Sequence, residues 1–283
     1  MHFHWGRLRR NRQMFAVKFT PAYDAIPNII HAYEPARRVL TSYTGNRLVR
    51  LRRASDNAEV DFGYIGNNDL NVAAIAAWAG GASYVVTVYD QAPAGDNITQ
   101  ATAANQPLYV ASIRNGHAGM TFDGTNDCLR GAFTTGGALS QPFSLFAVAR
   151  LDAAGVNDDE YRMLTDSDDI ANRLIMGQYP TGAPDTWRIM GGATLVGSGS
   201  DALWNIWSAL FNGASSQFWH NGVSEASGNA GAQNADGLTV GDSFNDLGRW
   251  WGDIVSVIIC DPSLSDAQRV AMQVQMNSYW AVY

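Results

Sequence analysis

The chain has 283 residues, of which 46% are hydrophobic and 11% are aromatic. It can therefore build a sizeable core, which excludes a wholly disordered protein. No apolar run approaches the roughly 20 residues of a membrane-spanning helix, and no signal-peptide core stands near the start, so we expect a soluble protein with no membrane partner. Two cysteines are too few for a disulfide-stapled scaffold or a cysteine zinc site.

The formal net charge of −7 conceals a strong asymmetry along the chain. Residues 1–53 hold eleven of the nineteen Lys and Arg residues but only two acidic ones. Residues 1–35 also contain three prolines and no helical periodicity, which predicts a basic, extended arm that anchors the protein to an acidic surface. The anchoring residues would be Arg7, Arg9, Arg10 and Arg12. A protein partner is favoured over nucleic acid, because the arm lacks Lys-rich blocks.

Three kinds of element are predicted between the arm and residue 106. A short helix-like start at Ala36 leads to a strand around Leu48–Leu51. Residues 69–80 predict a helix with Asp69 as the N-cap and Gly80 as the terminator. The β-branched run at 84–89 predicts another strand.

From residue 106 onward the pattern is one of short strands separated by turns. Their spacing of about ten to fifteen residues, without intervening helices, indicates an antiparallel sandwich. Asn221-Gly222 predicts a tight hairpin turn. Ser265 and Gln268 predict a capped final helix with an apolar face of Ala267, Val270, Ala271 and Val274. The predicted strands span residues 120–124, 127–133, 143–151, 172–179, 186–192, 204–213, 216–222, 238–243 and 250–261.

Four segments of the second part resemble one superfamily. They are GMTFDGTNDCL (119–129), PFSLFAVARL (142–151), WNIWSALFNGASSQFWHNG (204–222) and GRWWGDIVSVIICDPSLSDAQRVAM (248–272). Together they resemble the laminin-G-like jelly-roll branch of the concanavalin A-like lectin/glucanase superfamily. The resemblance implies an all-β jelly-roll sandwich over residues 36–283, with a laminin-G-like core at about 106–283, an extended N-terminal arm over 1–35 and a short C-terminal helix.

The first part is similar to a second family. YTGNRLVRLRRASDNAEVDFGY (43–64) and VVTVYDQAPAGDNITQATAANQPLYV (85–110) are similar to the N-terminal stretch of the α-L-arabinofuranosidase B family. Modules with this combination also resemble virion proteins of tailed phages. The resemblance implies a structural protein of a phage or phage-like virion, such as a head decoration, spike or tail-fibre component. Its partners would be other virion proteins, bound through the arm, and host surface glycans, bound by the lectin-like domain. It would act as a homo-oligomer, for instance a trimer, in a particle made in the host cytoplasm.

Two alternatives to this function stay open. One is a glycoside hydrolase acting on arabinose-containing polysaccharide, and the other is a decoration protein without a ligand. In the arabinofuranosidase family the acid/base Asp lies in a Gly-Gly-Asp-Asn-Ser loop, a position that Asp242 matches here. The family's nucleophile is a Glu after Asp-Tyr-Gly-Asn, and none of the four Glu of this chain has that context. A retaining enzyme needs both carboxyl groups about 5 Å apart, so a non-enzymatic role is favoured.

Acidic loops and aromatic residues supply the remaining candidate sites. Asp158, Asp159, Asp166 and Asp168 offer the hard oxygen ligands that calcium prefers, although solvated loop charges are the favoured interpretation. No other cofactor is predicted. Aromatic rings can stack on sugars while acidic side chains accept hydroxyl hydrogen bonds, unless the rings belong to the core. The candidate carbohydrate-binding residues are Trp187, Trp219, Trp250, Asp242 and Asp246.

Overall fold

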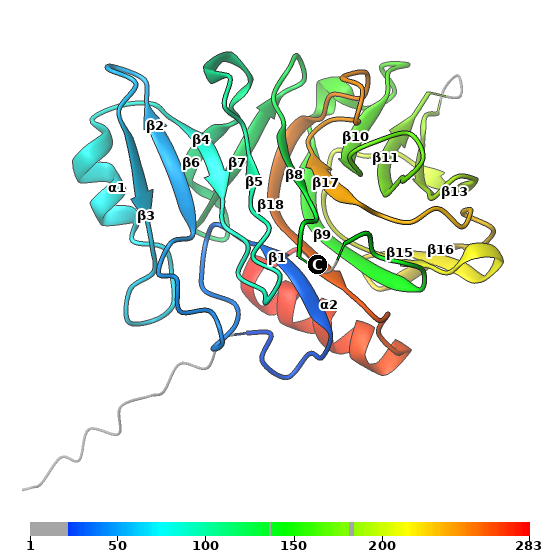
Figure 1. Ribbon diagram of the computed structural model, residues 1–283. Coiled ribbons are helices and arrows are strands. Elements are labelled where there is room, and N and C mark those ends of the chain that lie inside the picture. The colour runs from blue at the N-terminus through cyan, green and yellow to red at the C-terminus, as the bar shows by residue number, and fades with distance from the viewer. Residues whose placement is uncertain (1–21, 136, 181–183) are drawn as a thin grey trace, which may run out of the picture.

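The computed structural model describes residues 22–135, 137–180 and 184–283. They form an antiparallel β-structure with two α-helices, one between β3 and β4 and one at the C-terminal end (Figure 1). The strands are β1 (Ile29–Tyr33), β2 (Val49–Arg53), β3 (Glu59–Phe62), β4 (Ser83–Val88), β5 (Ile98–Thr99), β6 (Leu108–Arg114), β7 (His117–Asp123), β8 (Leu129–Ala132), β9 (Phe143–Leu151), β10 (Arg162–Asp166), β11 (Ile175–Tyr179), β12 (Thr186–Met190), β13 (Thr194–Gly199), β14 (Trp204–Phe211), β15 (Ser216–His220), β16 (Val223–Gly228), β17 (Gly237–Val240) and β18 (Trp251–Cys260). The α-helices are α1 (Val72–Ala79) and α2 (Asp266–Trp280), and three short 3-10 turns are η1 (Ala103–Asn105), η2 (Ala153–Gly155) and η3 (Gly213–Ser215).

Two series of paired strands build the sandwich. One series runs β3-β2-β4-β6-β7-β18-β9-β14-β15-β16. The other runs β5-β8-β17-β10-β11-β12-β13 and joins the first through the β4–β5 pairing. The all-β jelly-roll sandwich with a short C-terminal helix, which the sequence predicts, is therefore confirmed.

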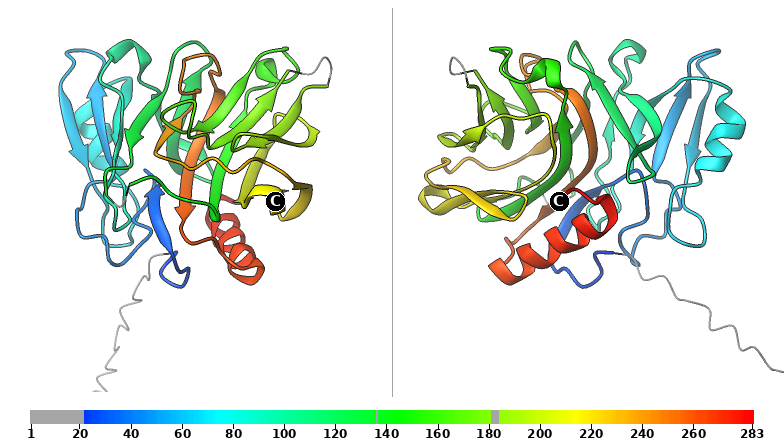
Figure 2. Two further views of the ribbon diagram at one scale, coloured as in Figure 1. Left: turned by 45° about the vertical axis from the view of Figure 1, so that its right-hand side comes forward. Right: turned by 180° about the vertical axis from the view of Figure 1, so that it is seen from behind.

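The strand β9 shows why the longest apolar run of the second part has no polar alternation. Leu145 and Ala147 point into the main core between the two series of strands. Phe146 and Val148 point to the opposite face, into a second core beneath α2. A strand that is buried on both faces reads as a continuous hydrophobic stretch. Figure 2 shows α2 lying across the sheet, at the opposite end of the molecule from the loop that follows β17.

The first helix starts later than predicted. Its N-cap is Asn71, whose side-chain oxygen accepts a hydrogen bond from the Ala74 amide at 3.2 Å. Asp69 instead accepts from the Asn67 side chain and forms an isolated β-bridge with Arg37. The predicted termination at Gly80 is confirmed, because this residue adopts a left-handed conformation with φ 61°.

The final helix has the predicted start but a different buried face. Ser265 and Gln268 form the predicted capping box. The side chains that pack on the sheet are Met272, Met276 and Trp280, each fully buried. The predicted apolar face is wrong, since Val270 and Val274 are 47% and 58% exposed.

The segment from residue 22 to 35 belongs to the sandwich and not to an extended arm. Strand β1 pairs with β18 next to the C-terminal helix. Glu34 is fully buried and accepts hydrogen bonds from the Tyr23 hydroxyl at 2.9 Å and the Ser256 hydroxyl at 2.8 Å. The predicted arm boundary at residue 35 is therefore too late, because isolated apolar residues between prolines gave no sign of a paired strand. Among the described residues, no helix has the length and apolar character needed to cross a membrane.

Candidate functional site

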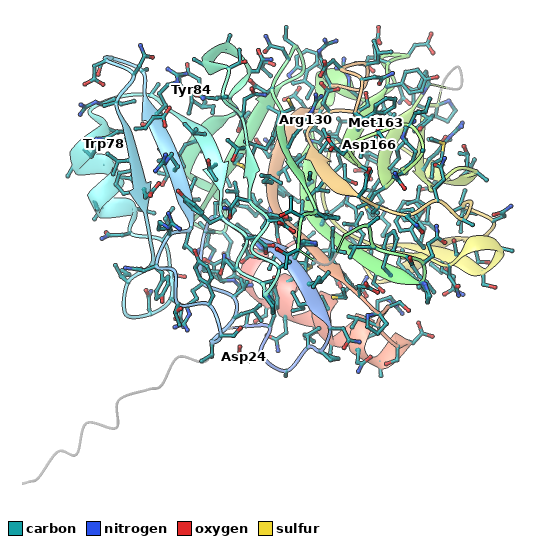
Figure 3. All side chains as sticks on the ribbon, viewed as in Figure 1. Asp24, Trp78, Tyr84, Arg130, Met163 and Asp166 are labelled. Atoms are coloured by element: carbon teal, nitrogen blue, oxygen red, sulfur yellow. The ribbon has the colours of Figure 1, made fainter. Side chains whose placement is uncertain are left out.

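Three neighbouring strands bring together an arginine and a carboxylate that are distant in the sequence. Arg130 of β8 pairs with Thr239 of β17, which pairs in turn with Asp166 of β10. Directly paired residues of adjacent strands share one face of a sheet, so these three side chains form a row. Arg130 and Asp166 are both labelled in the upper part of Figure 3. The loop 241–250, which follows β17, adjoins this row.

Asp166 is held on both of its carboxylate oxygens. Arg173 donates from Nε to Oδ1 at 2.9 Å and from Nη2 to Oδ2 at 2.8 Å. The Phe244 amide, from the loop 241–250, donates to Oδ2 at 3.1 Å. Asp166 has no exposed surface and the Arg173 side chain is only 13% exposed. This bidentate pair fixes the carboxylate in place.

Asp242 begins the same loop and is 1% exposed. Its Oδ1 accepts from the amides of Ser243 at 2.7 Å and Gly248 at 3.0 Å. Its Oδ2 lies 3.7 Å from Nη2 of Arg130. Burial raises the pKa of Asp242, and the two amides and Arg130 act in the opposite direction.

Arg130 bridges the buried carboxylate to an exposed one. Its Nη2 forms an ion pair with Asp246, whose side chain is 59% exposed, and donates to the Ser243 carbonyl at 2.9 Å. We call the group formed by Arg130, Asp166, Arg173, Asp242 and Asp246 the Asp242 cluster. It presents a partly exposed guanidinium and an exposed carboxylate above two buried, ordered carboxylates.

A glycine makes the turn into this loop possible. Gly241 has φ 83°, a left-handed conformation that favours glycine. A Cβ atom at this position would lie 2.2 Å from Cε1 of Phe122, a ring of the main core. The Val-Gly-Asp-Ser motif therefore aims Asp242 toward Arg130 only because residue 241 has no side chain.

A hollow of about 320 Å³ borders the loop 241–250, which also carries Asp242 and Asp246. Its lining includes Leu247 and Arg249 from the same loop, and Tyr161 and Arg162 from the start of β10. Tyr161 is 44% exposed and meets the Tyr179 ring edge-on, with ring centroids 5.0 Å apart. The hollow thus offers an exposed aromatic ring, and its Leu247 directly follows Asp246 in the chain.

The three predicted sugar-stacking tryptophans do not lie at this surface. Trp187 and Trp250 are 2% and 1% exposed and belong to the main core, with their ring centroids 6.2 Å apart. Trp219 is 7% exposed, and the Arg269 guanidinium covers its ring at 4.1 Å. None of these rings offers a face for a sugar, because sheet packing has taken them into the core. Asp242 and Asp246, the other two predicted residues, do come together through Arg130.

The predicted calcium ligands lie before, in and after strand β10. Asp158 forms an ion pair with Arg162, and Asp166 is occupied by Arg173. Asp168 is exposed, and Asp159 lies in a turn with φ 59°. Within the described part of the chain, no group of three or more acidic, His or Cys side chains is arranged to hold a metal ion.

The sequence pattern did not indicate Arg130, Arg173 or Tyr161 as candidate site residues. Arg130 looks like an isolated strand residue until the β8–β17 pairing brings it to the loop of Asp242. Arg173 looks like an ordinary loop residue until its contact with Asp166 is seen. The only available signal was charge, since buried acids require a partner. The predicted anchoring residues Arg7, Arg9, Arg10 and Arg12 lie outside the described residues.

Comparison with known proteins supports the fold. No protein-family model matches the sequence, and no curated protein does either. Among solved structures, the chain is similar to an arabinofuranosidase complexed with arabinofuranosyl-alpha-1,2-xylobiose, with a TM-score of 0.73 and 16% identity over 92% of this chain. A GH54 α-L-arabinofuranosidase soaked with a cyclic sulfate inhibitor gives a TM-score of 0.71 at 15% identity, again over 92% of this chain.

A more distant similarity extends to a toxin domain. The binding domain of botulinum neurotoxin serotype D matches 82% of this chain, and 51% of its own, with a TM-score of 0.52 and 9% identity. The chain spans 64% of the length of each of the two arabinofuranosidase chains. The chain therefore shares the sandwich fold of these arabinofuranosidases.

Proposed function

We propose that this protein is a non-enzymatic, glycan-binding structural protein of a phage or phage-like particle, and that it binds the glycan at the Asp242 cluster. The observation that carries the proposal is the bridge from Arg130 to the exposed Asp246, on a fold shared with arabinofuranosidases. The basic N-terminal segment supports anchoring to a particle through its charge.

The chemistry of the Asp242 cluster suits sugar hydroxyls. A hydroxyl both donates and accepts, so it can donate to the Asp246 carboxylate and accept from the Arg130 guanidinium. Tyr161 adds an exposed ring against which the apolar face of a sugar can pack. The hollow of about 320 Å³ gives this sugar a concave seat.

Binding without hydrolysis is favoured by the state of Asp166. A retaining mechanism requires a second carboxylate whose oxygen can attack the sugar. Both oxygens of Asp166 are engaged by Arg173, and one of them also accepts from the Phe244 amide. A carboxylate held in this way serves as an ordered acceptor and not as a nucleophile.

One observation favours a glycoside hydrolase as the second candidate function. Burial raises the pKa of Asp242, and a general acid in a glycosidase needs a raised pKa. In that case Asp242 would protonate the leaving group, and another carboxylate near the Asp242 cluster would be the nucleophile.

A single assay separates these functions. Purified protein is incubated with purified host surface polysaccharide or arabinan, and both retention on the polysaccharide and release of reducing ends are recorded. We expect retention without release. Release that disappears in Asp242→Asn would establish the hydrolase instead, and neither retention nor release would indicate a decoration protein without a ligand.

Variants test whether the Asp242 cluster is the site. Asp246→Asn and Tyr161→Ala should each weaken retention about tenfold, a loss typical of a charge-assisted or ring contact. The matched control is Asp56→Asn, since Asp56 is also exposed and ion-paired with an arginine, Arg53. Equal retention by Asp246→Asn and Asp56→Asn would contradict this placement of the glycan.

A further inference from the structure

A second polar pocket lies on another part of the sheet. It encloses about 560 Å³. One wall is a row of paired residues on adjacent strands: Arg52 of β2, Tyr84 of β4, Leu108 of β6 and Thr121 of β7. Figure 3 shows Tyr84 well apart from Arg130 and Asp166. The pocket is therefore distinct from the Asp242 cluster.

The strand alternation explains why this row faces away from the main core. Leu51 and Val85, the neighbours of Arg52 and Tyr84 along their strands, are fully buried in the main core. Side chains alternate between the two faces of a strand, so Arg52 and Tyr84 point away from that core. The 103–106 segment and the 123–127 loop then close the pocket over the row.

Arg52 is a fixed part of the wall. Its Nε donates to Gln106 at 2.6 Å, its Nη1 to Asn57 at 2.9 Å, and its Nη2 to the Ala103 carbonyl at 3.0 Å. Its guanidinium carbon lies 4.8 Å from the centroid of the Tyr84 ring. The arginine therefore orients the Tyr84 ring, and its remaining N–H groups stay available as donors.

The opposite wall carries a buried acceptor with an open position. Asp127 is 6% exposed, and its Oδ2 accepts from the Asp123 amide at 3.0 Å. Its Oδ1 accepts no hydrogen bond from the described residues, and within that part of the chain neither Asp123 nor Asp127 pairs with a basic side chain. Burial, followed by the charge of Asp123, raises the pKa of Asp127 to about 6. Because Asp127 lines the pocket and one of its oxygens is unused, it can accept a hydrogen bond from a ligand there.

We propose that this pocket is a second carbohydrate site, and that it binds a neutral sugar residue. Two carboxylates against one guanidinium give the pocket a net negative charge, which repels sialic and uronic acids. A neutral sugar supplies hydroxyl donors for Asp123 and Asp127, an acceptor for Arg52 and a face for the Tyr84 ring. The volume is in the range of small-molecule sites. The site does not depend on glycan binding at the Asp242 cluster.

The test uses the full chain and saturation-transfer NMR with D-glucose, D-galactose, D-mannose, L-arabinose and D-xylose. N-Acetylneuraminic acid is the anionic comparator. The background is Tyr161→Ala/Asp246→Asn, which silences the first site. In this background at least one neutral sugar should still bind, and adding Tyr84→Ala or Asp123→Asn should weaken its binding about tenfold. Both positions are at least partly exposed, so folding should survive, as circular dichroism would verify.

The outcomes distinguish this site from the first one. The second site is overturned if no neutral sugar binds in the background variant, if Tyr84→Ala and Asp123→Asn leave binding unchanged, or if N-acetylneuraminic acid binds equally well. Calorimetry with calcium alone adds a further check, because calcium binding lost in Asp123→Asn would make the pocket a cation site. If Tyr161→Ala/Asp246→Asn binds as well as the native chain while Tyr84→Ala does not, the first site fails and the second stands.

Discussion

At the scale of single residues, a recurring feature of the structure is the buried carboxylate that is paired with an arginine. Asp166, Glu34 and Asp253 are each at most 3% exposed, and each meets an arginine. Burying a carboxylate is expensive unless a cation and hydrogen-bond donors compensate. The arginines Arg173, Arg37 and Arg150 therefore compensate these buried charges. In the Asp242 cluster, Arg173 holds Asp166 in a fixed orientation.

Removing the arginine of such a pair should destabilise the fold. Arg173→Met keeps the aliphatic bulk but leaves Asp166 as an unpaired buried charge, so we expect a loss of about 3–5 kcal/mol in the free energy of unfolding. Urea unfolding measures it. In the control Arg47→Met, the removed arginine is 53% exposed and lies 3.8 Å from Asp61, so the loss should be about 0–1 kcal/mol. Equal losses in the two variants would show that the buried Arg173–Asp166 pair stabilises the fold no more than the exposed Arg47–Asp61 pair does.

Asp127 predicts a pH dependence of stability. Its pKa in the folded protein is about 6, above the usual 3.8, so the folded state holds the proton more tightly than the unfolded state. The contribution of protonated Asp127 to the stability of the fold is fully present below about pH 4 and is lost as the pH rises through about 6. Asp127→Asn, which mimics the protonated form, should therefore stabilise the protein more at neutral pH than at about pH 4. Because solvent reduces both the burial penalty and the repulsion between Asp127 and Asp123, we expect the stabilisation by Asp127→Asn to differ by roughly 1 kcal/mol between the two pH values.

Thermal unfolding at the two pH values measures this difference. The control is Asp56→Asn, because the Arg53 pair lowers the pKa of Asp56 to about 2. That variant should show no gain at neutral pH. A gain of the same size in both variants would mean that net charge, and not the pocket, causes the effect.

At the scale of elements, the C-terminal helix shows how packing selects one face. The helix is amphipathic only weakly, and its aliphatic Val270 and Val274 face solvent. The second core, which lies beneath α2, instead takes Met272, Met276 and Trp280. Long, flexible or wide side chains fill the irregular space above a twisted sheet better than short valines do.

The two faces of α2 should respond differently to truncation. Met276→Ala removes a fully buried side chain, so we expect a loss of about 2–5 kcal/mol. Val274→Ala, two positions earlier on the opposite face of the helix and 58% exposed, should change stability by less than about 0.5 kcal/mol. Chemical unfolding of both variants checks this, and a larger loss for Val274→Ala would contradict the packing of the helix.

At the scale of the whole molecule, the two ends of the described chain close the sandwich together. Strand β1 pairs with β18, and the Tyr279 hydroxyl donates to the Asp69 carboxylate at 3.1 Å. The Arg37 guanidinium lies 3.6 Å above the Tyr279 ring. Residues 22–40 are therefore part of the structural unit, and any anchoring role belongs to residues before them.

Two truncations should separate anchoring from folding. Deleting residues 1–21 keeps every described element of the sandwich, so we expect an unchanged melting temperature and unchanged glycan retention, but loss of incorporation into particles. Deleting residues 1–35 also removes β1 and Glu34, and should lower the melting temperature by roughly 10 °C or more. Calorimetry and particle purification give the two readouts. Normal incorporation of the shorter truncation would contradict the anchoring role.

Prediction from sequence succeeded where the signal is local. The strand Phe143–Leu151 has the predicted bounds. Asn221 and Gly222 have the positive φ values of a tight hairpin turn. The capping box at Ser265 forms as predicted. In each case the residues involved lie within a few positions of one another, so their hydrogen bonds and side-chain alternation are already specified by neighbours.

Taken by itself, the amino-acid sequence determined the fold class, the Asn221-Gly222 turn and the capping box of the final helix, and it singled out Asp242 and Asp246. Only the tertiary structure decided which aromatic rings are buried, and it placed Arg130 between those two acids and aligned it with Asp166. The reason is physical: this row joins residues on β8, β17 and β10, whose pairing depends on register across the whole sheet. Burial likewise depends on which strands pack together, so Trp187 and Trp250 look like binding residues until the sandwich closes over them.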